Sequence, residues 1–378
     1  MANVAFPEAT GRRLEESDRL VRARTPAQLA WRQLRKHRMA LIGGIIVVLL
    51  YFVTIFGEFF APYSLDFTDR SKFYHPPTPL RFVDDQGQFS LRPFVYGTHL
   101  ADPATRRYET NADEKYYVRF FVRGEPYRLL FLIPTNIHFF GVDEPGRIFL
   151  MGTDQFGRDL LSRVLIGGRI SMFLGVFVLM VSLPIGVIYG AISGYFGGRV
   201  DNVMMRIAEI VIAFPEFYLL LALAAVLPPQ IPSTTRLVLI VVIISFVGWG
   251  GLARLVRGMV LSLRTQEYVL AARASGAGTA YILRRHVIPN TATLLIVVAT
   301  LSIPGAMIAE AALSFFGLGI REPQASWGQL LNVANNLTTL TQSPWLLWPG
   351  AFIVVAVVGY NLLGDGLRDA LDPRLRTS

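Results

Sequence analysis

Two acidic side chains lie inside long apolar runs of this sequence, and they are the first candidates for chemistry. Glu216 lies in the run 207–227 and Glu310 in the run 291–319, and each follows a proline. A carboxylate inside a membrane span is costly, and a proline loosens the hydrogen bonding of the backbone around it. These residues are therefore candidates to line a transport pathway, to hold an ion or a proton, or to fix a broken helix to its neighbour.

Other kinds of chemistry find little support. The sequence contains no cysteine, which excludes disulfides, cysteine metal sites and thiol catalysis. The five histidines are scattered without the spacing of metal ligands, and no Gly-x-x-x-x-Gly-Lys-Ser/Thr run is present to hold ATP. We expect no catalytic residue, no bound cofactor and no metal site in this chain, and so a non-enzymatic role.

The composition is that of a membrane protein. Hydrophobic residues make up 52% of the 378 residues and charged residues 17%, against about 25% charged in soluble domains. The net charge of +9 comes from basic residues that flank the apolar runs. Positive cytoplasmic loops explain this charge better than a nucleic-acid partner does.

Six apolar runs predict membrane spans, and the basic residues between them predict the topology. The runs are 39–57, 170–196, 207–227, 237–253, 291–319 and 345–363. Arginines dominate residues 1–38, lie in each short inner connection and follow the last run, so both termini are expected in the cytoplasm. We therefore predict an all-α polytopic membrane protein with an uncleaved first span, 39–60. Residues 26–39 form either an amphipathic helix on the inner membrane face or a solvated tail. In the run 207–227, Glu209 is expected to pair with Arg206.

Residues 61–151 differ from the rest of the chain and predict a small external domain between the first and second spans. The segment is polar and rich in proline and aromatic residues. Alternating runs at 116–123 and 127–133 predict two β-strands, with Gly124 and Glu125 in a hairpin turn between them. The sequence leaves open whether this β-rich insert is a lid or spacer or contacts substrate.

The longest strongly basic connection between apolar runs is 267–290, within the loop 254–290 of the core region 152–378. Its first half is built from small residues on a short helix, which would let another backbone approach closely. Glycine is expected to end that helix, and Pro289 to stop or kink whatever helix precedes it. The residues of this stretch that we expect to matter most are Tyr268, Ala271, Ala272, Arg273, Gly276, Ala277, His286 and Pro289.

This stretch resembles the cytoplasmic coupling loop of importer-type ABC transporter permeases. The usual pattern is Glu-Ala-Ala, three residues, Gly, nine residues, Ile, one residue, Leu-Pro. Aligned on Gly276, the Glu and Ile positions are Leu270 and His286, and the Pro position is Pro289. The form Tyr-Val-x-Ala-Ala-Arg-Ala-x-Gly is similar to the peptide/nickel subfamily, in which those two positions vary. Two further stretches are similar to it: Gly-Thr-Asp-x-x-Gly-Arg-Asp at 152–159, where we expect Asp154 to cap the second span, and the closing segment 360–376.

The resemblance implies a type I ABC importer permease in the bacterial cytoplasmic membrane. It implies a second homologous permease subunit, two ATP-binding cassette ATPases that bind ATP and Mg²⁺, and an external solute-binding protein. The substrates it implies are dipeptides, oligopeptides or related small solutes such as nickel chelates. Two alternatives remain at this point. One is a secondary transporter or channel that uses Glu216 and Glu310 as ion sites, and the other is a membrane-anchored external enzyme.

Overall fold

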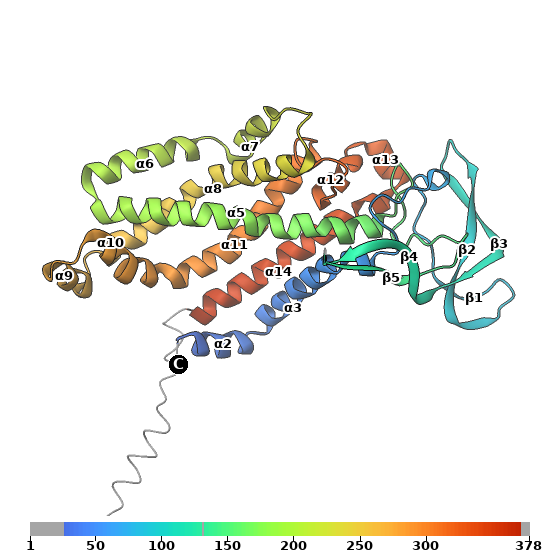
Figure 1. The fold of residues 1–378 in the computed structure, drawn as a ribbon, viewed down its shortest axis with the longest axis horizontal. Helices are drawn as coiled ribbons and strands as arrows, with labels where there is room; N and C mark the ends of the chain where they lie inside the picture. Colours follow the sequence, from blue (N-terminus) through green and yellow to red (C-terminus); the bar gives the residue numbers. More distant parts are fainter. Residues whose placement is uncertain (1–25, 131, 372–378) are drawn as a thin grey trace, which may run out of the picture.

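The computed structural model of the chain describes residues 26–130 and 132–371. Figure 1 shows a long bundle of helices with a group of β-strands at one end. Among the described residues, five helices are long and apolar enough to cross a membrane, or six if one bent pair counts as a span. The long helices are α3 (Arg38–Ile55), α5 (Leu160–Phe196), α8 (Ser233–Leu263), the continuous helix Thr279–Phe315, which contains α10 (Thr279–Ile282) and α11 (Ile288–Phe315), and α14 (Trp348–Leu371).

The bent pair is α6 (Gly198–Ala213) and α7 (Glu216–Ala225), which meet at 79°. The apolar run 207–227, which predicted a single span, is therefore divided between two helices. Pro215 explains the break, because it has no backbone N–H to donate and it disfavours a helical conformation in the residue before it. Phe214 is accordingly extended, with φ −78° and ψ 136°. Each of the other five predicted runs lies mainly on one long helix.

Shorter helices fill the connections. They are α2 (Pro26–Lys36), α4 (Gly57–Phe60), α9 (Glu267–Ala274), α12 (Trp327–Leu331) and α13 (Leu337–Gln342), with single turns at Arg70–Lys72, Asn332–Asn335 and Pro344–Leu347. For residues 26–36 the structure has the helix that was one of the two alternatives. Most of the predicted N-terminal segment 1–38, and the end of the closing segment 360–376, lie outside the described residues.

Helix α5 packs closely against α8 through glycines. A methyl group added at Gly190 would lie 2.3 Å from the Ala253 carbonyl oxygen, and one at Gly194 would lie 2.7 Å from the Arg257 carbonyl oxygen. Only a residue without a side chain lets the two backbones approach this closely. These glycines therefore serve packing. The same principle holds α3 against α14, where a methyl group on Gly43 would lie 2.6 Å from the Gly359 carbonyl oxygen.

The strands lie between α3 and α5 in the chain and form two antiparallel sheets. Three strands make one sheet and two make the other: β1 (Arg81–Val83), β2 (Phe89–Asp102) and β3 (Arg107–Tyr117), then β4 (Arg119–Leu129) and β5 (Ile133–Gly141).

The predicted positions of the strands and of their turn are wrong. The run 116–123 spans the break between β3 and β4, and Gly124 and Glu125 lie inside β4, at an irregularity of its pairing with β5. Glycine and proline at 124 and 126 weaken a strand locally and favour such a bulge, which from the sequence resembles a turn.

Candidate functional site

Helix α9 lies at the end of the bundle farthest from the strands (Figure 1). One side of it is held by apolar contacts. Val269 is buried in a cluster with Val256 and Val260 of α8, and Ala272 and Ala277 pack against the same cluster. Residues 254–263 of the predicted loop are part of α8, so the non-helical connection is shorter than the sequence predicted.

Glycine ends α9, as predicted. Gly276 has φ +80°, a conformation that residues with a side chain rarely adopt. The Gly276 N–H donates to the Arg273 carbonyl and the Ala277 N–H to the Ala272 carbonyl, both at 3.1 Å. This is the pattern of a Schellman motif, in which the left-handed residue satisfies the last carbonyls of the helix. A methyl group on Gly276 would meet nothing within 4 Å, so its role is conformational.

The other side of α9 is exposed. Tyr268 is 40% and Leu270 49% exposed, and the small side chains of Ala271 and Ala274 are exposed as well. Arg273 also points outward. The small residues therefore do not serve close packing within this chain, apart from those that contact α8. Because their side chains are short, the backbone of another chain can approach this side of α9 closely.

The predicted break at Pro289 is absent. The helix runs unbroken from Thr279 to Phe315, and the segment Leu283–Val287 before the proline is a π-helical turn. The Ile288 N–H donates to the Leu283 carbonyl, five residues back. A π-turn widens the helix where proline supplies no donor, which explains how the chain continues through it. His286, within this turn, lies near the rings of Tyr281 and Tyr268, with centroids 5.7 and 6.3 Å away.

The two candidate carboxylates have different surroundings. Glu310 is completely buried, and its Oε1 accepts hydrogen bonds from Ser314 Oγ at 2.6 Å and Ser326 Oγ at 2.7 Å. It thereby ties α11 to the start of α12, although α11 runs unbroken through Pro304, where a break was expected. These contacts favour the helix-fixing interpretation.

Glu216 is exposed at the first residue of α7, where a negative charge suits the helix dipole. Its part in a pathway stays a prediction. The expected pair of Arg206 and Glu209 is present, at 3.4 Å and exposed.

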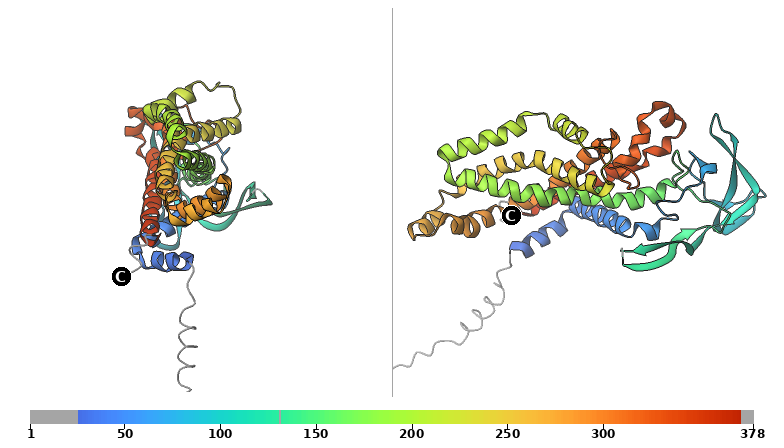
Figure 2. Two further views of the ribbon diagram at one scale, coloured as in Figure 1. Left: turned by 90° about the vertical axis from the view of Figure 1, so that its left-hand side faces the viewer. Right: turned by 45° about the horizontal axis from the view of Figure 1, so that its top comes forward.

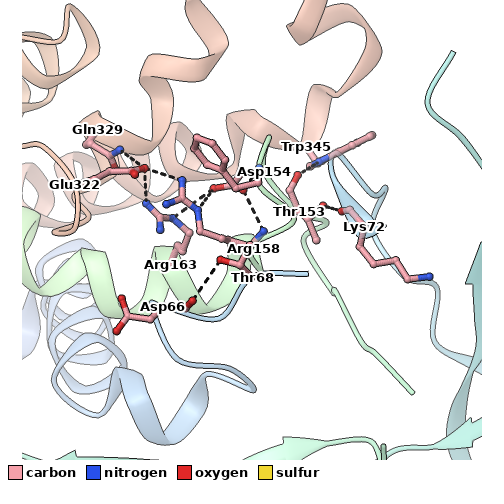
Figure 3. A network of polar contacts seen from close by, with 11 residues as sticks. Asp66, Thr68, Lys72, Thr153, Asp154, Arg158, Arg163, Glu322, Gln329 and Trp345 are labelled. Atoms are coloured by element: carbon pink, nitrogen blue, oxygen red, sulfur yellow. Dashed lines mark hydrogen bonds and ion pairs between the residues drawn. The ribbon is translucent and has the colours of Figure 1, made fainter. Parts of the chain in front are cut away.

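The motif at 152–159 forms a polar network where α5 begins (Figure 3). The prediction that Asp154 caps α5 is wrong, because Asp159 does so: its Oδ2 accepts from the Ser162 N–H at 2.8 Å and from Ser162 Oγ at 2.6 Å. Asp154 instead closes the preceding loop. It accepts from the Phe156 N–H at 2.8 Å and pairs with Arg158 Nε at 2.7 Å.

The same network joins α5 to the segment that follows α11. Arg158 Nη2 lies 2.7 Å from Glu322 Oε1, and Arg163 Nη2, whose side chain is 2% exposed, lies 3.6 Å from it. The hydrogen bond from Arg158 holds the pKa of Glu322 below its ordinary value. The Trp345 indole N–H donates to the Thr153 carbonyl at 3.0 Å and ties in the segment before α14. We refer to this network, residues 152–163 with Glu322 and Trp345, as the junction.

Sequence reasoning missed the partners of the junction. The motif at 152–159 indicated that Arg158 and Asp159 matter, but no nearby pattern marks Glu322, which is 164 residues away from Arg158.

Sequence reasoning also missed a second group of polar contacts, at the other end of the bundle. Arg257 Nε lies 2.8 Å from Asp201 Oδ1, to which Ser193 Oγ also donates, so that α5, α6 and α8 are held together.

Comparison with known proteins identifies the family. A sequence model described as "Binding-protein-dependent transport system inner membrane component" matches residues 183–377. A second, described as "N-terminal TM domain of oligopeptide transport permease C", matches residues 25–77.

Individual relatives agree. The oligopeptide transport system permease protein OppC of Bacillus subtilis is 45% identical over 233 residues, 61% of this chain and 74% of that protein. The protein of the same name from Escherichia coli is 45% identical over 234 residues, 62% of this chain and 74% of that protein. The dipeptide transport system permease protein DppC of Bacillus subtilis is 34% identical over 351 residues, 92% of this chain and 86% of that protein.

Membership of this family favours an ATP-driven importer over the secondary transporter, the channel and the external enzyme, and it implies ATPase and binding-protein partners in general. The chain belongs to the inner membrane components of binding-protein-dependent transport systems, and it is a multi-pass permease subunit in the bacterial inner membrane.

Proposed function

We propose that this chain forms half of the translocation pathway of an importer for dipeptides or oligopeptides. The proposal for the substrate rests on relatives whose names specify oligopeptide and dipeptide transport. The chain would pair with a second homologous permease subunit, two ATPase subunits and an external solute-binding protein. ATP and Mg²⁺ would bind to the ATPases, and this chain would hold no cofactor.

The proposed topology has six spans, with the bent pair of α6 and α7 as the third and both termini in the cytoplasm. Helix α9 then lies on the cytoplasmic side and the strands lie outside. Arginines on the segment 267–290, and Arg199 in the first turn of α6, fit this orientation.

The observation that carries the coupling role is the two-sided construction of α9. Its outer side is exposed and carries the short side chains of Ala271 and Ala274, so the surface of an ATPase can pack closely against it. Its inner side is fixed to α8 through Val269 and to the helix Thr279–Phe315 through Ile282 and Val287. A displacement of α9 by the closing ATPases would therefore reach two membrane helices directly, without an intervening flexible segment.

An exposed alanine gives a sharp test of this role. Ala271→Trp adds bulk on the outer side of α9 without touching the cluster under Val269, whereas Ala271→Ser keeps the surface low. In proteoliposomes with the partner subunits, we expect Ala271→Trp to reduce peptide uptake about tenfold, which corresponds to about 1.4 kcal/mol of lost docking free energy. The transporter should still assemble in the membrane, and Ala271→Ser should transport normally. Normal uptake by Ala271→Trp would contradict the docking role.

The substrate class needs a separate measurement. The reconstituted transporter with its binding protein should take up labelled dipeptides or longer peptides and should not take up the free amino acids. Uptake of a nickel chelate in place of peptides would leave the permease role intact and overturn the substrate.

A further inference from the structure

The two strands β4 and β5 form a ribbon, residues 119–141, that is set apart from the three-stranded sheet. Figures 1 and 2 show that it runs back from the strand end of the molecule toward the helices. In the left view of Figure 2, along the bundle, it projects to one side of the helices rather than continuing their direction. The ribbon therefore overhangs the end of the bundle at which α3 finishes.

Aromatic contacts fix the base of the ribbon to the first span. Helix α4, which follows α3 directly, presents Phe59 and Phe60, whose ring centroids lie 5.8 and 5.5 Å from that of Phe139. Phe121 lies 6.3 Å from Phe59. His138 Nδ1 is 2.7 Å from the Ala61 carbonyl oxygen. The ribbon is thus attached at the point where the first span leaves the apolar layer, where aromatic residues gather in membrane proteins.

The ribbon exposes large apolar side chains. Phe120 and Phe121 are 59% and 65% exposed, and near the tip Leu132 and Ile133 are 80% and 57% exposed. A soluble surface rarely presents so many apolar groups together, and such patches mark contact with a membrane or another protein.

Basic residues alternate with these apolar groups. Arg119, Arg123 and Arg128 are all exposed on β4, and Glu125 is the only acidic residue of the ribbon. Apolar groups combined with arginines match the boundary layer of a phospholipid membrane, which offers hydrocarbon beside anionic phosphates. A protein partner would need a surface that is both apolar and acidic at the same place.

We propose that the β4–β5 ribbon lies in the outer headgroup layer of the membrane. Leu132 and Ile133 would reach the edge of the hydrocarbon, and Arg123 and Arg128 would bind lipid phosphates. The third arginine of β4, Arg119, pairs with Asp143 at 3.0 Å. The proposal rests on the external placement of the strands proposed above. Its consequence is that the three-stranded sheet is held at a fixed position over the membrane beside the end of the first span.

The absence of cysteine from the native chain allows a direct measurement. A single cysteine at Leu132→Cys carries a nitroxide label in the assembled transporter, in nanodiscs that contain phosphatidylglycerol. Leu91→Cys is the matched control, because Leu91 is also an apolar strand residue, 86% exposed, but lies on β2 in the other sheet. A transporter with the unsubstituted chain, labelled in the same way, corrects for cysteines of the partner subunits.

We expect the label at 132 to be severalfold more accessible to oxygen, relative to a water-soluble nickel complex, than the label at 91. Equal exposure to water at both positions would overturn the proposal. Shielding of the label at 132 from oxygen and nickel alike would mean that a protein covers the tip, and would also overturn it.

A membrane-impermeant thiol reagent distinguishes failure of the proposed topology from failure of this inference. It should reach Leu91→Cys from outside in intact cells. Reaction only after the membrane is opened would overturn the external placement itself, and with it the proposed topology. Reaction from outside combined with a water-exposed label at 132 would overturn only the membrane contact of the ribbon.

Discussion

Helix α9 and the junction lie near opposite ends of α5. The polar side chains of α9 are exposed, whereas several polar side chains of the junction are buried. In α9, only apolar side chains turn inward, and Arg273 and the small residues of the outer side are exposed. In the junction, by contrast, Asp154, Asp159 and Arg163 are buried, and their contacts are with the chain itself. Each region was recognised in the sequence by its similarity to a motif of the permease family. The comparison teaches that spacing locates an important segment, while its contacts decide whether it serves a partner or joins the chain's own elements.

The largest expected effect comes from a comparison of two glycines that both have a positive φ. Gly157 has φ +74° and a methyl group there would lie 1.8 Å from the Asp69 carbonyl oxygen, whereas Gly276 has φ +80° and open space. Gly157→Ala should lower the free energy of unfolding by about 3–5 kcal/mol, from overpacking and strain together. Gly276→Ala should lower it by only about 1 kcal/mol, from strain alone.

Thermal unfolding of both variants in detergent measures this difference. Similar losses in the two variants would mean that the junction is no tighter than the end of α9, and the contrast between the regions would fail.

The two carboxylates give the next largest effect. Glu310→Ala leaves the hydroxyls of Ser314 and Ser326 without their acceptor and opens a cavity, so we expect a loss of about 3 kcal/mol of stability. Glu216→Ala changes an exposed residue and should stay within about 0.5 kcal/mol. Glu310→Gln keeps an acceptor at the same place and should restore most of the stability.

Transport by Glu310→Gln separates the two interpretations of this residue. A stable, assembled variant that no longer transports would show that the carboxylate lines the pathway. Normal transport is the outcome expected if Glu310 only joins α11 to α12.

The sequence predicted the parts of this molecule that local patterns determine. Apolar length located five of the long helices, and the positive φ of Gly276 followed from its place at the end of a small-residue helix. The failures arose where distant groups decide the structure. The carboxylate that caps α5 is Asp159 rather than Asp154 because the helix begins only at Leu160. Asp154 instead pairs with Arg158, which is held in turn by Glu322, 164 residues further along the chain.

Two prolines with opposite effects show the same limit of local patterns. At Pro215 the helix breaks by 79°, whereas at Pro289 the chain continues through a π-turn. Proline removes the same hydrogen bond at both positions. The neighbouring backbone determines whether the helix breaks or widens. The local sequence around each proline does not show which of the two will happen.

The smallest expected effect is the pH dependence of the junction. Arg158 holds the pKa of Glu322 below its ordinary value of 4.5. A carboxyl whose pKa is lowered by folding stabilises the folded state when it is ionised. That contribution is complete above the ordinary value and is lost as the pH falls through the lowered pKa. Because the Glu322 side chain is 43% exposed, solvent screens the pair and we expect less than about 1 kcal/mol.

The contribution of Asp159 to stability changes with pH in the opposite direction, so a variant is needed that separates the two groups. Burial raises its pKa to about 7, so stability should increase as Asp159 takes up a proton below that pH. The variant Glu322→Gln removes the titration of residue 322 and keeps that of Asp159. The melting temperatures of the native chain and of Glu322→Gln, compared from pH 7 down to pH 3, should diverge only in the acid part of the range, with the native chain losing more. Parallel curves would show that the pair of Arg158 and Glu322 contributes nothing to the junction, which would then depend on the buried contacts of Asp154, Asp159 and Arg163 alone.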